Sequence, residues 1–475
     1  MTAPVETALV PEALRGGVLV AGAGVSGLGA ARLLDAVGVT CVVADDNPAN
    51  REKVAGETSA RAVSTADATE LFDEVSIVVT SPGWRPDSPL LVAAQHAGLE
   101  VIGDVELCFR LDRAGVFGPP RTWLVVTGTN GKTTTTGMLA SIMGEASKDS
   151  GLRAQACGNI GVAVSDALVD AHRVDVLVAE LSSFQLYWSH QLVPDAGVLL
   201  NLADDHIDWH GSFAAYAQAK AKVLRARVAV AGVDDAEVAS LAARTGRDDV
   251  IGFTLGEPGP NQAGVIGHRL VFNSGAELQD LASVTGIEPA GIAGVLDALA
   301  AAAVAVSQGV SSQRIDDGLR SYRIEGHRGA VVHEANGVRW VDNSKATNPH
   351  AADSALAGAG EPGTVVWVAG GQLKGASVDE LVATHAHLFR AVAMLGVDRE
   401  IVLEAVRRHA PGVPVFVSES TDPAEAMDQC VRFAAEQALP GDTVLLAPAA
   451  ASLDMFSGMS ARGDEFAAAA MRHCV

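Results

Sequence analysis

A glycine-rich turn, TGTNGKTTTT, carries the residues of this chain whose chemistry can be defined most directly. It follows an apolar run at residues 122–126 and precedes a helix-compatible stretch that ends near Glu145, so a strand, a turn and a helix are predicted. Such a turn presents backbone N–H groups at the positive end of a helix dipole, and Lys132 adds a full positive charge. Thr133 is placed to offer its hydroxyl to a phosphate-bound Mg²⁺. The turn predicts a nucleotide-phosphate site that uses ATP or GTP; the simpler alternative is a βα turn with an incidental lysine.

Two further groups stand at the ends of strand-like runs in the same region. Glu180 closes DVLVAEL, and His206 follows Asp204 and Asp205 at the end of AGVLLNLADDH. Because ligands of open α/β sheets lie beyond the carboxyl ends of the strands, we expect these side chains on the sheet edge that carries Lys132. Together with a threonine hydroxyl they could bind a divalent metal beside a triphosphate. Taken singly, Glu180 would be a solvated strand-end charge and His206 a helix-cap residue.

Lys220 and Asn159 are two more candidates in this region. Lys220 follows Tyr216 by one helical turn on a predicted helix, so their side chains share a face. An exposed helical lysine is the default interpretation, whereas partial burial beside metal ions would lower its pKa and change its chemistry. Asn159 lies in CGNIG between two glycines, where a turn-forming role is the alternative to ligand binding.

The N-terminal region holds a second glycine-rich turn. Gly22, Gly24 and Gly27 form G-x-G-x-x-G after a strand-like run, and Asp45 and Asp46 end the next run about 20 residues on. This is the spacing of a dinucleotide fingerprint, although the same turn can hold any diphosphate. Because the chain then has two nucleotide-type sites, we expect this one to bind a nucleotide-linked substrate rather than a redox cofactor.

The C-terminal region contributes three polar loops, each after a strand-like run. They are DNSKATN at 342–348, GGQLKG at 370–375 and PAAASLDMFSGMSARG at 448–463. Lys345, Lys374 and Ser452 could therefore converge at one sheet edge, where cationic and hydroxyl groups suit an anionic substrate or the far side of ATP. Each residue could equally belong to an ordinary loop.

Three α/β units must position these loops, because strand-like and helix-compatible segments alternate along the chain. We expect three doubly wound units: a Rossmann-like unit at 1–120, a central P-loop-type ATPase sheet at 121–325 and a C-terminal Rossmann-like unit at 326–475. The segments FGPPR at 117–121 and SYRIEGHRG at 321–329 are the predicted boundaries.

Composition excludes several classes of protein. The chain has 475 residues, 48% of them apolar and 19% charged, which is a globular composition. Its formal net charge of −23 argues against nucleic-acid partners and anionic membranes. We find neither an apolar run of about 18 residues nor a basic start typical of a signal peptide. Five scattered cysteines suit a reducing compartment, so a cytoplasmic enzyme is expected. We also expect it to be a monomer.

Twelve short segments, taken together, resemble a known family over almost the whole chain. They are GAGVSG, SPG, GDVEL, TGTNGKTTT, GNIG, ELSSFQL, DDHIDWH, YAQAK, GHR, NSKATN, the GG…KG stretch and ASLDMF. The family they resemble is the Mur ligases. TGTNGKTTT is typical of the superfamily, which includes folylpolyglutamate synthases, whereas ELSSFQL, SKATN and ASLD…RG point to the D-glutamate-adding member.

The resemblance implies an ATP-consuming, amide-forming reaction in peptidoglycan precursor synthesis. The carboxylate of UDP-N-acetylmuramoyl-L-alanine would attack the γ-phosphate of ATP, giving an acyl phosphate and ADP. The amine of D-glutamate would then attack the acyl carbon, and phosphate would leave through a tetrahedral intermediate. Lys132 and two Mg²⁺ ions would stabilise charge on the phosphoryl oxygens.

The resemblance also implies a role for each matching residue. Lys132, His206 and Lys220 would be catalytic, with one Mg²⁺ held by Thr133 and Glu180 and the other by His206 and a carbamylated Lys220. The residues that would contact ATP are Gly128, Thr129, Asn130, Gly131, Lys132, Thr133, Thr134, Arg328, Asn343 and Lys345. Those that would contact the UDP-linked substrate are Gly24, Val25, Ser26, Asp45, Asp46, Ser81 and Asn159. Thr347, Lys374, Ser452 and Met459 would surround D-glutamate.

The chain departs from the family pattern at four places. Asn343 stands where the family usually has aspartate, and a neutral amide would bond a ribose hydroxyl more weakly than a carboxylate. Met459 replaces a residue that is commonly aromatic. Gly294 and Asp297 stand where asparagines are expected on the adenine side. Val126 replaces the first glycine of the strict phosphate-loop pattern, as is ordinary in this superfamily.

Three alternatives to the D-glutamate-adding enzyme remain open at this point. A folylpolyglutamate synthase would not be expected to carry a glycine-rich UDP-binding unit before its phosphate loop. An NAD-dependent dehydrogenase rests on GAGVSG alone and leaves TGTNGKTTT unexplained. A non-catalytic nucleotide-binding regulator would show no substrate-dependent phosphate release.

Overall fold

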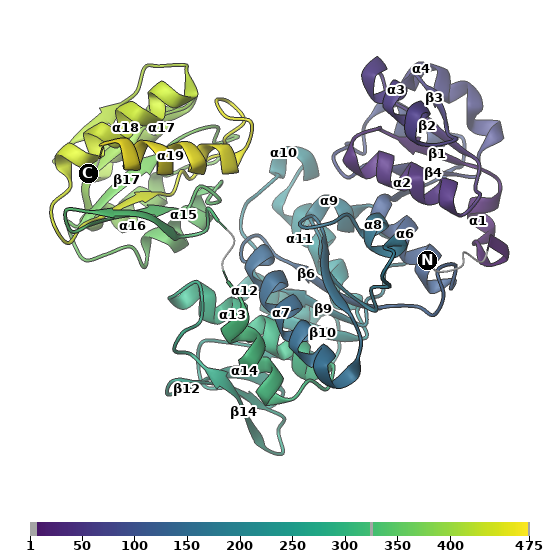
Figure 1. Cartoon of the computed structure of the whole chain (residues 1–475), viewed down its shortest axis with the longest axis horizontal. Coiled ribbons are helices and arrows are strands. Elements are labelled where there is room, and N and C mark those ends of the chain that lie inside the picture. The colour runs from purple at the N-terminus through teal and green to yellow at the C-terminus, as the bar shows by residue number, and fades with distance from the viewer. Residues whose placement is uncertain (1–6, 324–325, 474–475) are drawn as a thin grey trace. The chain divides into compact units, whose positions relative to one another are not determined.

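The computed structural model describes residues 7–323 and 326–473 and contains two compact units (Figure 1). The first unit is made of residues 1–287 and 295–322, and the second of 288–294 and 323–475, apart from the residues outside the described ranges. Within the described residues, two sheets lie in the first unit and one in the second. The predicted α/β fold with three sheets is confirmed. The predicted boundaries at 120/121 and 325/326 stay predictions, and residue 325 lies outside the described residues.

The N-terminal sheet is wholly parallel, and its order among the described strands is β3-β2-β1-β4-β5. Its strands are β1 (Val18–Ala21), β2 (Cys41–Ala44), β3 (Arg61–Val63), β4 (Ile77–Thr80) and β5 (Glu100–Gly103). Its main helices are α2 (Val25–Ala36), α3 (Pro48–Glu57), α5 (Pro89–His96) and α6 (Asp104–Arg113). The strand order reverses between β1 and β4, which is where sheets of this type bind ligands.

The central sheet has nine strands in the described residues, in the order β14-β13-β12-β11-β10-β9-β6-β8-β7. The strands are β6 (Thr122–Thr127), β7 (Ala154–Gly158), β8 (Val176–Glu180), β9 (Ala196–Leu199), β10 (Val228–Gly232), β11 (Ile251–Phe253), β12 (Gln262–Ile266), β13 (Arg269–Asn273) and β14 (Leu278–Ser283). The pairs from β7 to β12 are parallel, whereas β12, β13 and β14 form an antiparallel extension that the sequence did not predict.

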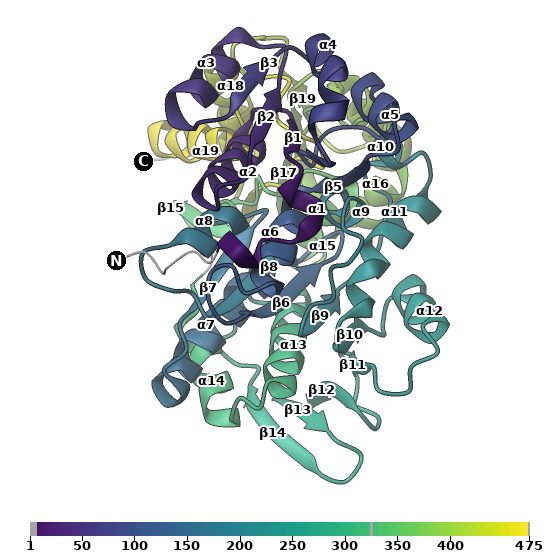
Figure 2. The same ribbon diagram turned by 90° about the vertical axis from the view of Figure 1, so that its right-hand side faces the viewer.

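Helices cover this sheet and complete its core. They include α7 (Lys132–Ser150), α8 (Val164–Val169), α9 (Ser183–Tyr187), α10 (Ile207–His210), α11 (Phe213–Ala221), α12 (Ala236–Arg244), α13 (Ile292–Ser307) and α14 (Ser312–Ser321). Helix α14 packs against both α7 and β14, so the antiparallel extension is tied to the helix that follows the phosphate loop (Figure 2). The helix predicted to end near Glu145 continues to Ser150.

The first two sheets share one hydrophobic core, which explains why they form a single compact unit. Phe109 of α6 packs edge-on against Trp123 of β6, with ring centroids 5.4 Å apart. Beside them, the Arg121 guanidinium donates a 2.7 Å hydrogen bond to Asp112, and both side chains are buried. Separating such a buried pair would leave a charge buried without a partner, which destabilises the fold. The pair therefore favours one fixed packing of α6 on the central sheet.

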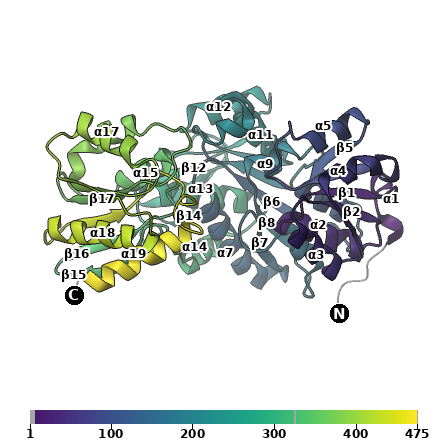
Figure 3. The ribbon, with the colours of Figure 1, turned by 90° about the horizontal axis from the view of Figure 1, so that it is seen from above.

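The C-terminal sheet has the order β15-β16-β20-β17-β18-β19 in the described residues, and only β15 and β16 pair antiparallel. Its strands are β15 (Ala330–Ala335), β16 (Val338–Asp342), β17 (Val365–Ala369), β18 (Phe389–Met394), β19 (Val415–Val417) and β20 (Thr443–Leu446). Its helices are α15 (Pro349–Leu356), α16 (Asp379–His385), α17 (Arg399–His409), α18 (Pro423–Gln437) and α19 (Met459–His473). Helices α18 and α19 cover one face, and α15 and α17 the other (Figure 3).

Strand β17 shows why this sheet is covered on both sides. Trp367 packs into the cluster under α15 and α17, whereas Val366 and Val368 pack into the cluster under α18 and α19. Because successive side chains point to opposite faces of a sheet, a continuous apolar run is needed where both faces are buried. None of the described helices combines the length and apolar character that a membrane crossing requires.

Candidate active site

The predicted phosphate loop lies between β6 and α7. Gly131 precedes α7 with φ of 79°, and a Cβ atom there would come within 2.2 Å of the Asp297 carboxylate. Asp297 also accepts a 3.0 Å hydrogen bond from the Thr135 hydroxyl. Asn201 fixes the other side of the loop, because its side-chain oxygen accepts a 2.8 Å hydrogen bond from the Asn130 N–H. Glycine is therefore required at residue 131, and Asp297 supports the start of α7.

The Lys132 ammonium group lies over this loop. It donates hydrogen bonds of 3.0 Å to the Gly128 carbonyl and 2.7 Å to the Thr129 carbonyl. These contacts place a positive charge at the turn, where α7 also presents its N-terminal N–H groups. The loop thus has the charge and the donors that a polyphosphate needs.

Glu180 is held between two of the predicted site residues. The Thr133 hydroxyl donates a 2.7 Å hydrogen bond to Glu180 Oε2, and Asn159 Nδ2 donates a 2.9 Å hydrogen bond to Oε1. Strand register explains this meeting, because Glu180 pairs with Val126 on one side and with Gly158 on the other. Glu180 is only 1% exposed, so the interpretation as a solvated strand-end charge is wrong.

The ELSSFQL segment turns directly from β8 into α9. Ser182 and Gln185 form a capping box, in which each side chain bonds the other residue's backbone N–H. This cap sets Ser183 and Phe184 on the first turn of the helix. Phe184 then packs against the His206 ring with centroids 4.7 Å apart.

His206 has a left-handed backbone with φ of 53° and stands at the N-cap of α10. Its side chain makes no capping hydrogen bond, and its Nε2 lies 3.6 Å from Asp205 Oδ2. His210, one turn later, accepts or donates a 3.0 Å hydrogen bond with the Ser183 hydroxyl. Burial and the charges of His206 and Lys220 lower the pKa of His210 to about 4, so this ring is neutral at physiological pH.

Lys220 is buried, so the default interpretation of an exposed helical lysine is wrong. Its Nζ donates a 2.6 Å hydrogen bond to the Gly128 carbonyl and lies 5.1 Å from the centre of the Tyr216 ring, which confirms their shared face. Burial, followed by the charge of Lys132, holds the pKa of Lys220 well below its usual value, while Asp205 and Glu180 oppose this shift.

The side chains beside the phosphate loop supply only some of the ligands that a magnesium ion needs. Among the described residues, no group of three or more His, Cys, Asp or Glu side chains is arranged to hold a metal ion. Thr133 and Glu180 do bring a hydroxyl and a carboxylate together, and such oxygen donors suit a hard cation. Mg²⁺ usually keeps several waters and shares its sphere with substrate phosphates. This edge therefore fits an ion that arrives with a triphosphate.

A small cavity lies beside the phosphate loop. Its volume is about 70 Å³, and it is lined by Leu200, Asn201, Gly232, Asp234, Asp235, Phe253, Leu296 and Asp297. Apolar and aromatic side chains form one part of its wall and carboxylates another. Because Asn201 and Asp297 also hold the phosphate loop, this cavity adjoins the loop.

Asp45 and Asp46, the two carboxylates predicted to contact the UDP-linked substrate, both accept hydrogen bonds from residues near the N-terminal sheet. Asp45 Oδ2 accepts a 2.8 Å hydrogen bond from the Ala23 N–H and so holds the glycine turn. Asp46 accepts a 3.0 Å hydrogen bond from the Thr65 N–H, and the bonds from Thr65 lower its pKa. Sequence reasoning missed Asp104 at the start of α6. Burial raises the pKa of its carboxyl group to about 6, and hydrogen bonds from Val105 and Ser26 act in the opposite direction.

Of the predicted nucleotide residues in the second unit, Asn343 and Lys345 lie on the loop after β16, and Arg328 lies just before β15. Asn343 N–H donates a 2.8 Å hydrogen bond to Leu446 O, and Lys345 N–H donates one of 3.1 Å to His327 O. Asp342, which precedes the unusual Asn343, is buried and lies 2.6 Å from His327 Nδ1. The carboxylate of this loop therefore orders His327, next to Arg328, rather than facing solvent.

Arg462 brings the three polar loops of the second unit together, and sequence reasoning did not assign it a role. Its buried guanidinium donates bonds of 2.9 Å to both the hydroxyl and the carbonyl of Ser344, and one of 3.1 Å to Ala450 O. A weaker 3.4 Å contact reaches Gly370 O. Burial lowers the pKa of Arg462 to about 10. The RG pair that closes the ASLD…RG segment was the available signal.

The four predicted D-glutamate residues lie on these loops. Lys374 is exposed with φ of 54°, Ser452 is buried and Met459 begins α19. Thr347 N–H donates a 2.8 Å hydrogen bond to Lys345 O. Within residues 326–473, no hydrogen bond joins these four side chains to one another. Their convergence on one amino acid stays a prediction.

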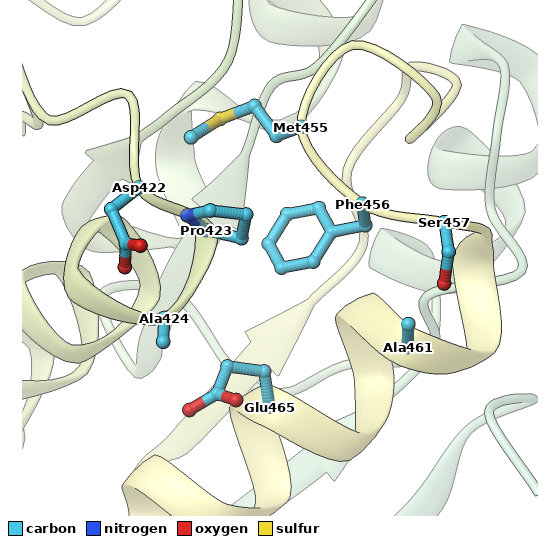
Figure 4. A pocket seen from close by; sticks show the side chains of 8 residues that line it. All are labelled: Asp422, Pro423, Ala424, Met455, Phe456, Ser457, Ala461 and Glu465. Atoms are coloured by element: carbon cyan, nitrogen blue, oxygen red, sulfur yellow. The ribbon is translucent and has the colours of Figure 1, made fainter.

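The second unit also has a cavity of about 300 Å³ (Figure 4). It is lined by Asp422, Pro423, Ala424, Met455, Phe456, Ser457, Ala461 and Glu465. None of the predicted D-glutamate residues lines it, and its two carboxylates would repel a dianionic amino acid. We therefore do not assign D-glutamate to this cavity.

Family comparisons agree with this arrangement of three loop-bearing sheets. The Mur ligase middle domain matches residues 126–305, the Mur ligase glutamate ligase domain matches 327–450, and the MurD-like N-terminal domain of Mur ligases matches 16–103. The chain belongs to the Mur ligase family. The match of the N-terminal unit to a Mur ligase domain also removes the dehydrogenase alternative, which rested on the glycine turn alone.

Within the family, the chain is similar to a particular group of enzymes. A relative from Corynebacterium diphtheriae is 58% identical over 100% of this chain and 99% of its own length, and one from Corynebacterium efficiens is 58% identical over 99% and 98%. Both relatives are named UDP-N-acetylmuramoylalanine--D-glutamate ligase. The chain is therefore a ligase, and the resemblance found in its sequence is confirmed.

Solved structures support the fold. MurF from Acinetobacter baumannii aligns with a TM-score of 0.59 at 16% identity, covering 98% of this chain and 100% of that one. UDP-N-acetylmuramate-alanine ligase from Thermotoga maritima aligns with a TM-score of 0.56 at 15% identity, covering 96% and 99%. At this level of identity, the likeness shows the shared architecture alone.

Proposed function

We propose that this chain uses ATP to join D-glutamate to UDP-N-acetylmuramoyl-L-alanine in the synthesis of peptidoglycan precursors. The observation that carries the proposal is the buried Glu180 carboxylate between Thr133 and Asn159, beside a phosphate loop that carries Lys132. This geometry supports the proposal, because a carboxylate suited to Mg²⁺ lies beside the phosphate loop and bonds an amide that could contact the second substrate. The named relatives supply the identity of the two substrates.

The first step is phosphoryl transfer at the loop. A carboxylate oxygen of the UDP-linked substrate forms a bond to the γ-phosphorus of ATP, the bond to the β,γ-bridging oxygen breaks, and ADP leaves. Negative charge spreads over the phosphoryl oxygens, so the Lys132 ammonium and the α7 N–H groups stabilise the transition state. Lys132 must first exchange its bonds to the Gly128 and Thr129 carbonyls for phosphate oxygens.

The second step forms the amide. The D-glutamate amine attacks the acyl carbon, the C–O bond to phosphate breaks, and a proton leaves the nitrogen. We assign one D-glutamate carboxylate to Lys374 and Thr347, and the other to Ser452 and the Met459 N–H. Arg462 fixes the loops that carry these residues by bonding Ser344, Ala450 and Gly370.

Two magnesium ions fit this scheme. When bound, they would neutralise charge on the phosphoryl oxygens. Thr133 and Glu180 would hold one, and His206 and Lys220 the other. Lys220 would first lose its positive charge: its neutral amine attacks carbon dioxide, an N–C bond forms and a proton leaves, giving a carbamate. Burial of the Lys220 amine favours the neutral form that this reaction requires.

The remaining substrate contacts follow from the positions of the loops. We assign the UDP portion to the glycine turn, Asp45, Asp46 and Ser81, and the far side of ATP to Arg328, Asn343 and Lys345. Asp45 would act by holding the turn as well as by contact, because it already bonds the Ala23 N–H. We expect a monomer that works in the cytoplasm, where its nucleotide substrates are available.

Phosphate and ADP release tests the proposal. Release should require UDP-N-acetylmuramoyl-L-alanine and D-glutamate together with ATP, and omission of either substrate should abolish amide formation. Release that depends on a folate substrate and L-glutamate would instead favour a folylpolyglutamate synthase. ATP binding without release under any of these conditions would favour a non-catalytic regulator.

A further inference from the structure

The segment Ser81–Arg85, directly after β4, lies against the glycine turn of the N-terminal unit. Ala21 at the end of β1 pairs with Thr80 at the end of β4, so Gly22 and Ser81 follow at matched positions. A Cβ atom built on Gly22 would lie 2.7 Å from Trp84 Nε1 and 3.0 Å from Ser81 Oγ. An indole N–H and a hydroxyl therefore converge on the turn.

Neither of these two polar groups has a partner within the described residues. Ser81 Oγ is buried without a hydrogen bond, and the contacts of Trp84 do not include one from its indole nitrogen. An indole N–H can only donate, so it needs an acceptor. The Ser81 hydroxyl is the buried member of this pair, and because buried polar groups are almost always satisfied, it indicates a ligand beside the glycine turn. The Trp84 side chain is only partly buried, and its N–H can donate to an acceptor oxygen of the same ligand.

The same segment is fastened to the central sheet through its backbone. The indole N–H groups of Trp188 and Trp209 each lie 3.4 Å from a carbonyl oxygen of the segment, at Trp84 and Gly83 respectively. The Arg85 guanidinium donates a 2.7 Å hydrogen bond to Asp208 O. These three contacts fix the backbone that carries the Trp84 side chain.

We propose that Trp84 donates its indole N–H to a diphosphate oxygen of the UDP-linked substrate, with the Ser81–Arg85 segment preset by Trp188, Trp209 and Arg85. Ser81 offers its hydroxyl to the same group. The donors at this turn, including the N–H groups at the start of α2, all suit an anion. The inference rests on the proposed function, because it takes the UDP-linked substrate as the ligand of this turn.

The test is calorimetric titration of the full chain with UDP and with UDP-N-acetylmuramoyl-L-alanine. Trp84→Phe keeps an aromatic ring and removes the N–H, so both ligands should bind at least about tenfold more weakly, as expected for loss of a hydrogen bond to a charged group. The Michaelis constant for ATP should stay within about twofold. Trp340→Phe is the matched control, because Trp340 lies in the second unit and its buried Nε1 has no partner in the described residues.

A second variant tests whether the contact between Trp209 and Gly83 positions the Ser81–Arg85 segment. Trp209→Phe removes the bond to Gly83 O and keeps an aromatic ring beside Phe184, Tyr187 and His210, so it should weaken UDP by a few-fold, less than Trp84→Phe. Equal affinity of Trp84→Phe and the unaltered chain for UDP would overturn the inference while leaving the proposed function intact. Failure of the unaltered chain to bind either UDP ligand would count against the proposed function itself. If Trp84→Phe weakened the binding of UDP-N-acetylmuramoyl-L-alanine but not that of UDP, Trp84 would contact the sugar and not the diphosphate, and the inference would also be overturned.

Discussion

The Thr133 hydroxyl donates a 2.7 Å hydrogen bond to the buried carboxylate of Glu180. One residue belongs to α7, the helix after the phosphate loop, and the other ends the neighbouring strand β8, so the bond joins the start of this helix to the end of that strand. A hydroxyl and a carboxylate oxygen held this close can turn toward one cation without a large rearrangement. The pair therefore joins the phosphate loop to the carboxylate that we propose as a metal ligand.

Glu180→Gln should lower turnover by at least about a hundredfold and raise the Mg²⁺ concentration needed for half-maximal rate. The amide keeps the size of the side chain but removes the charge that a cation needs. A magnesium titration of phosphate release measures both effects. An unchanged magnesium requirement, with the protein still folded, would remove Glu180 from the metal site.

Lys132→Ala should reduce turnover by about a thousandfold or more while leaving the thermal melt nearly unchanged. Its ammonium group donates to the Gly128 and Thr129 carbonyls of the loop, and we propose that its main role is to stabilise the negative charge that develops on the phosphoryl group. Phosphate release and a thermal melt on the same sample check this. Turnover close to that of the unaltered chain would take the phosphate loop out of the reaction.

Lys220→Ala should be inactive and should regain part of its activity with short carboxylates such as acetate, which would supply the oxygens of the lost carbamate. Lys148→Ala is a suitable control, because that lysine is exposed on α7 and should neither lose activity nor respond to acetate. A mass measurement of the intact chain adds a direct readout. An unmodified amine together with no rescue would contradict the carbamate.

Lys374→Ala should raise the Michaelis constant for D-glutamate by at least about tenfold and leave that for ATP nearly unchanged. A dianionic amino acid needs a cation in a protein with a net charge of −23, and Lys374 is exposed on the loop after β17. Initial rates at varied D-glutamate and at varied ATP separate the two constants. A weaker ATP interaction would place Lys374 in the nucleotide site, and equal use of L-glutamate would contradict the two-carboxylate site.

His210 should make the fold less stable in mild acid. Its pKa is about 4 in the folded chain against an ordinary value of 6.5, so between these pH values the unfolded chain binds a proton that the folded chain does not. Stability is therefore lost as the pH falls through this window. The melting temperature of the unaltered chain should drop more between pH 7 and pH 5 than that of His210→Gln. Parallel curves for the two proteins would show that His210 does not contribute.

The sequence predicts best the parts of the fold where strands are buried on both faces. The runs before the phosphate loop and before Glu180 are continuous and apolar, so their ends and the loops that follow were placed correctly. Strand β14 was missed because only two of its six residues are buried, which leaves little apolar pattern. Strand β18 was missed for a different reason. It is mostly buried, but its sequence FRAVAM is rich in residues that also suit a helix.

Contacts between site residues could be predicted only where both residues belong to one motif or where they end adjacent strands. Burial of Lys220 depends on contacts with the phosphate loop, which lies 92 residues away in sequence. Arg462 bonds Ser344 across 118 residues. Such contacts depend on how helices pack over the sheets, and no local pattern of residue types encodes them.

Three of the chain's six tryptophans, Trp84, Trp188 and Trp209, meet where the segment after β4 is fastened to the central sheet. Indole emission depends on local polarity and on nearby quenchers, so this junction is an intrinsic optical reporter. Binding of the proposed UDP-linked substrate at the glycine turn should therefore change the tryptophan fluorescence of the unlabelled protein, so that the binding rate can be measured separately from the rate of catalysis.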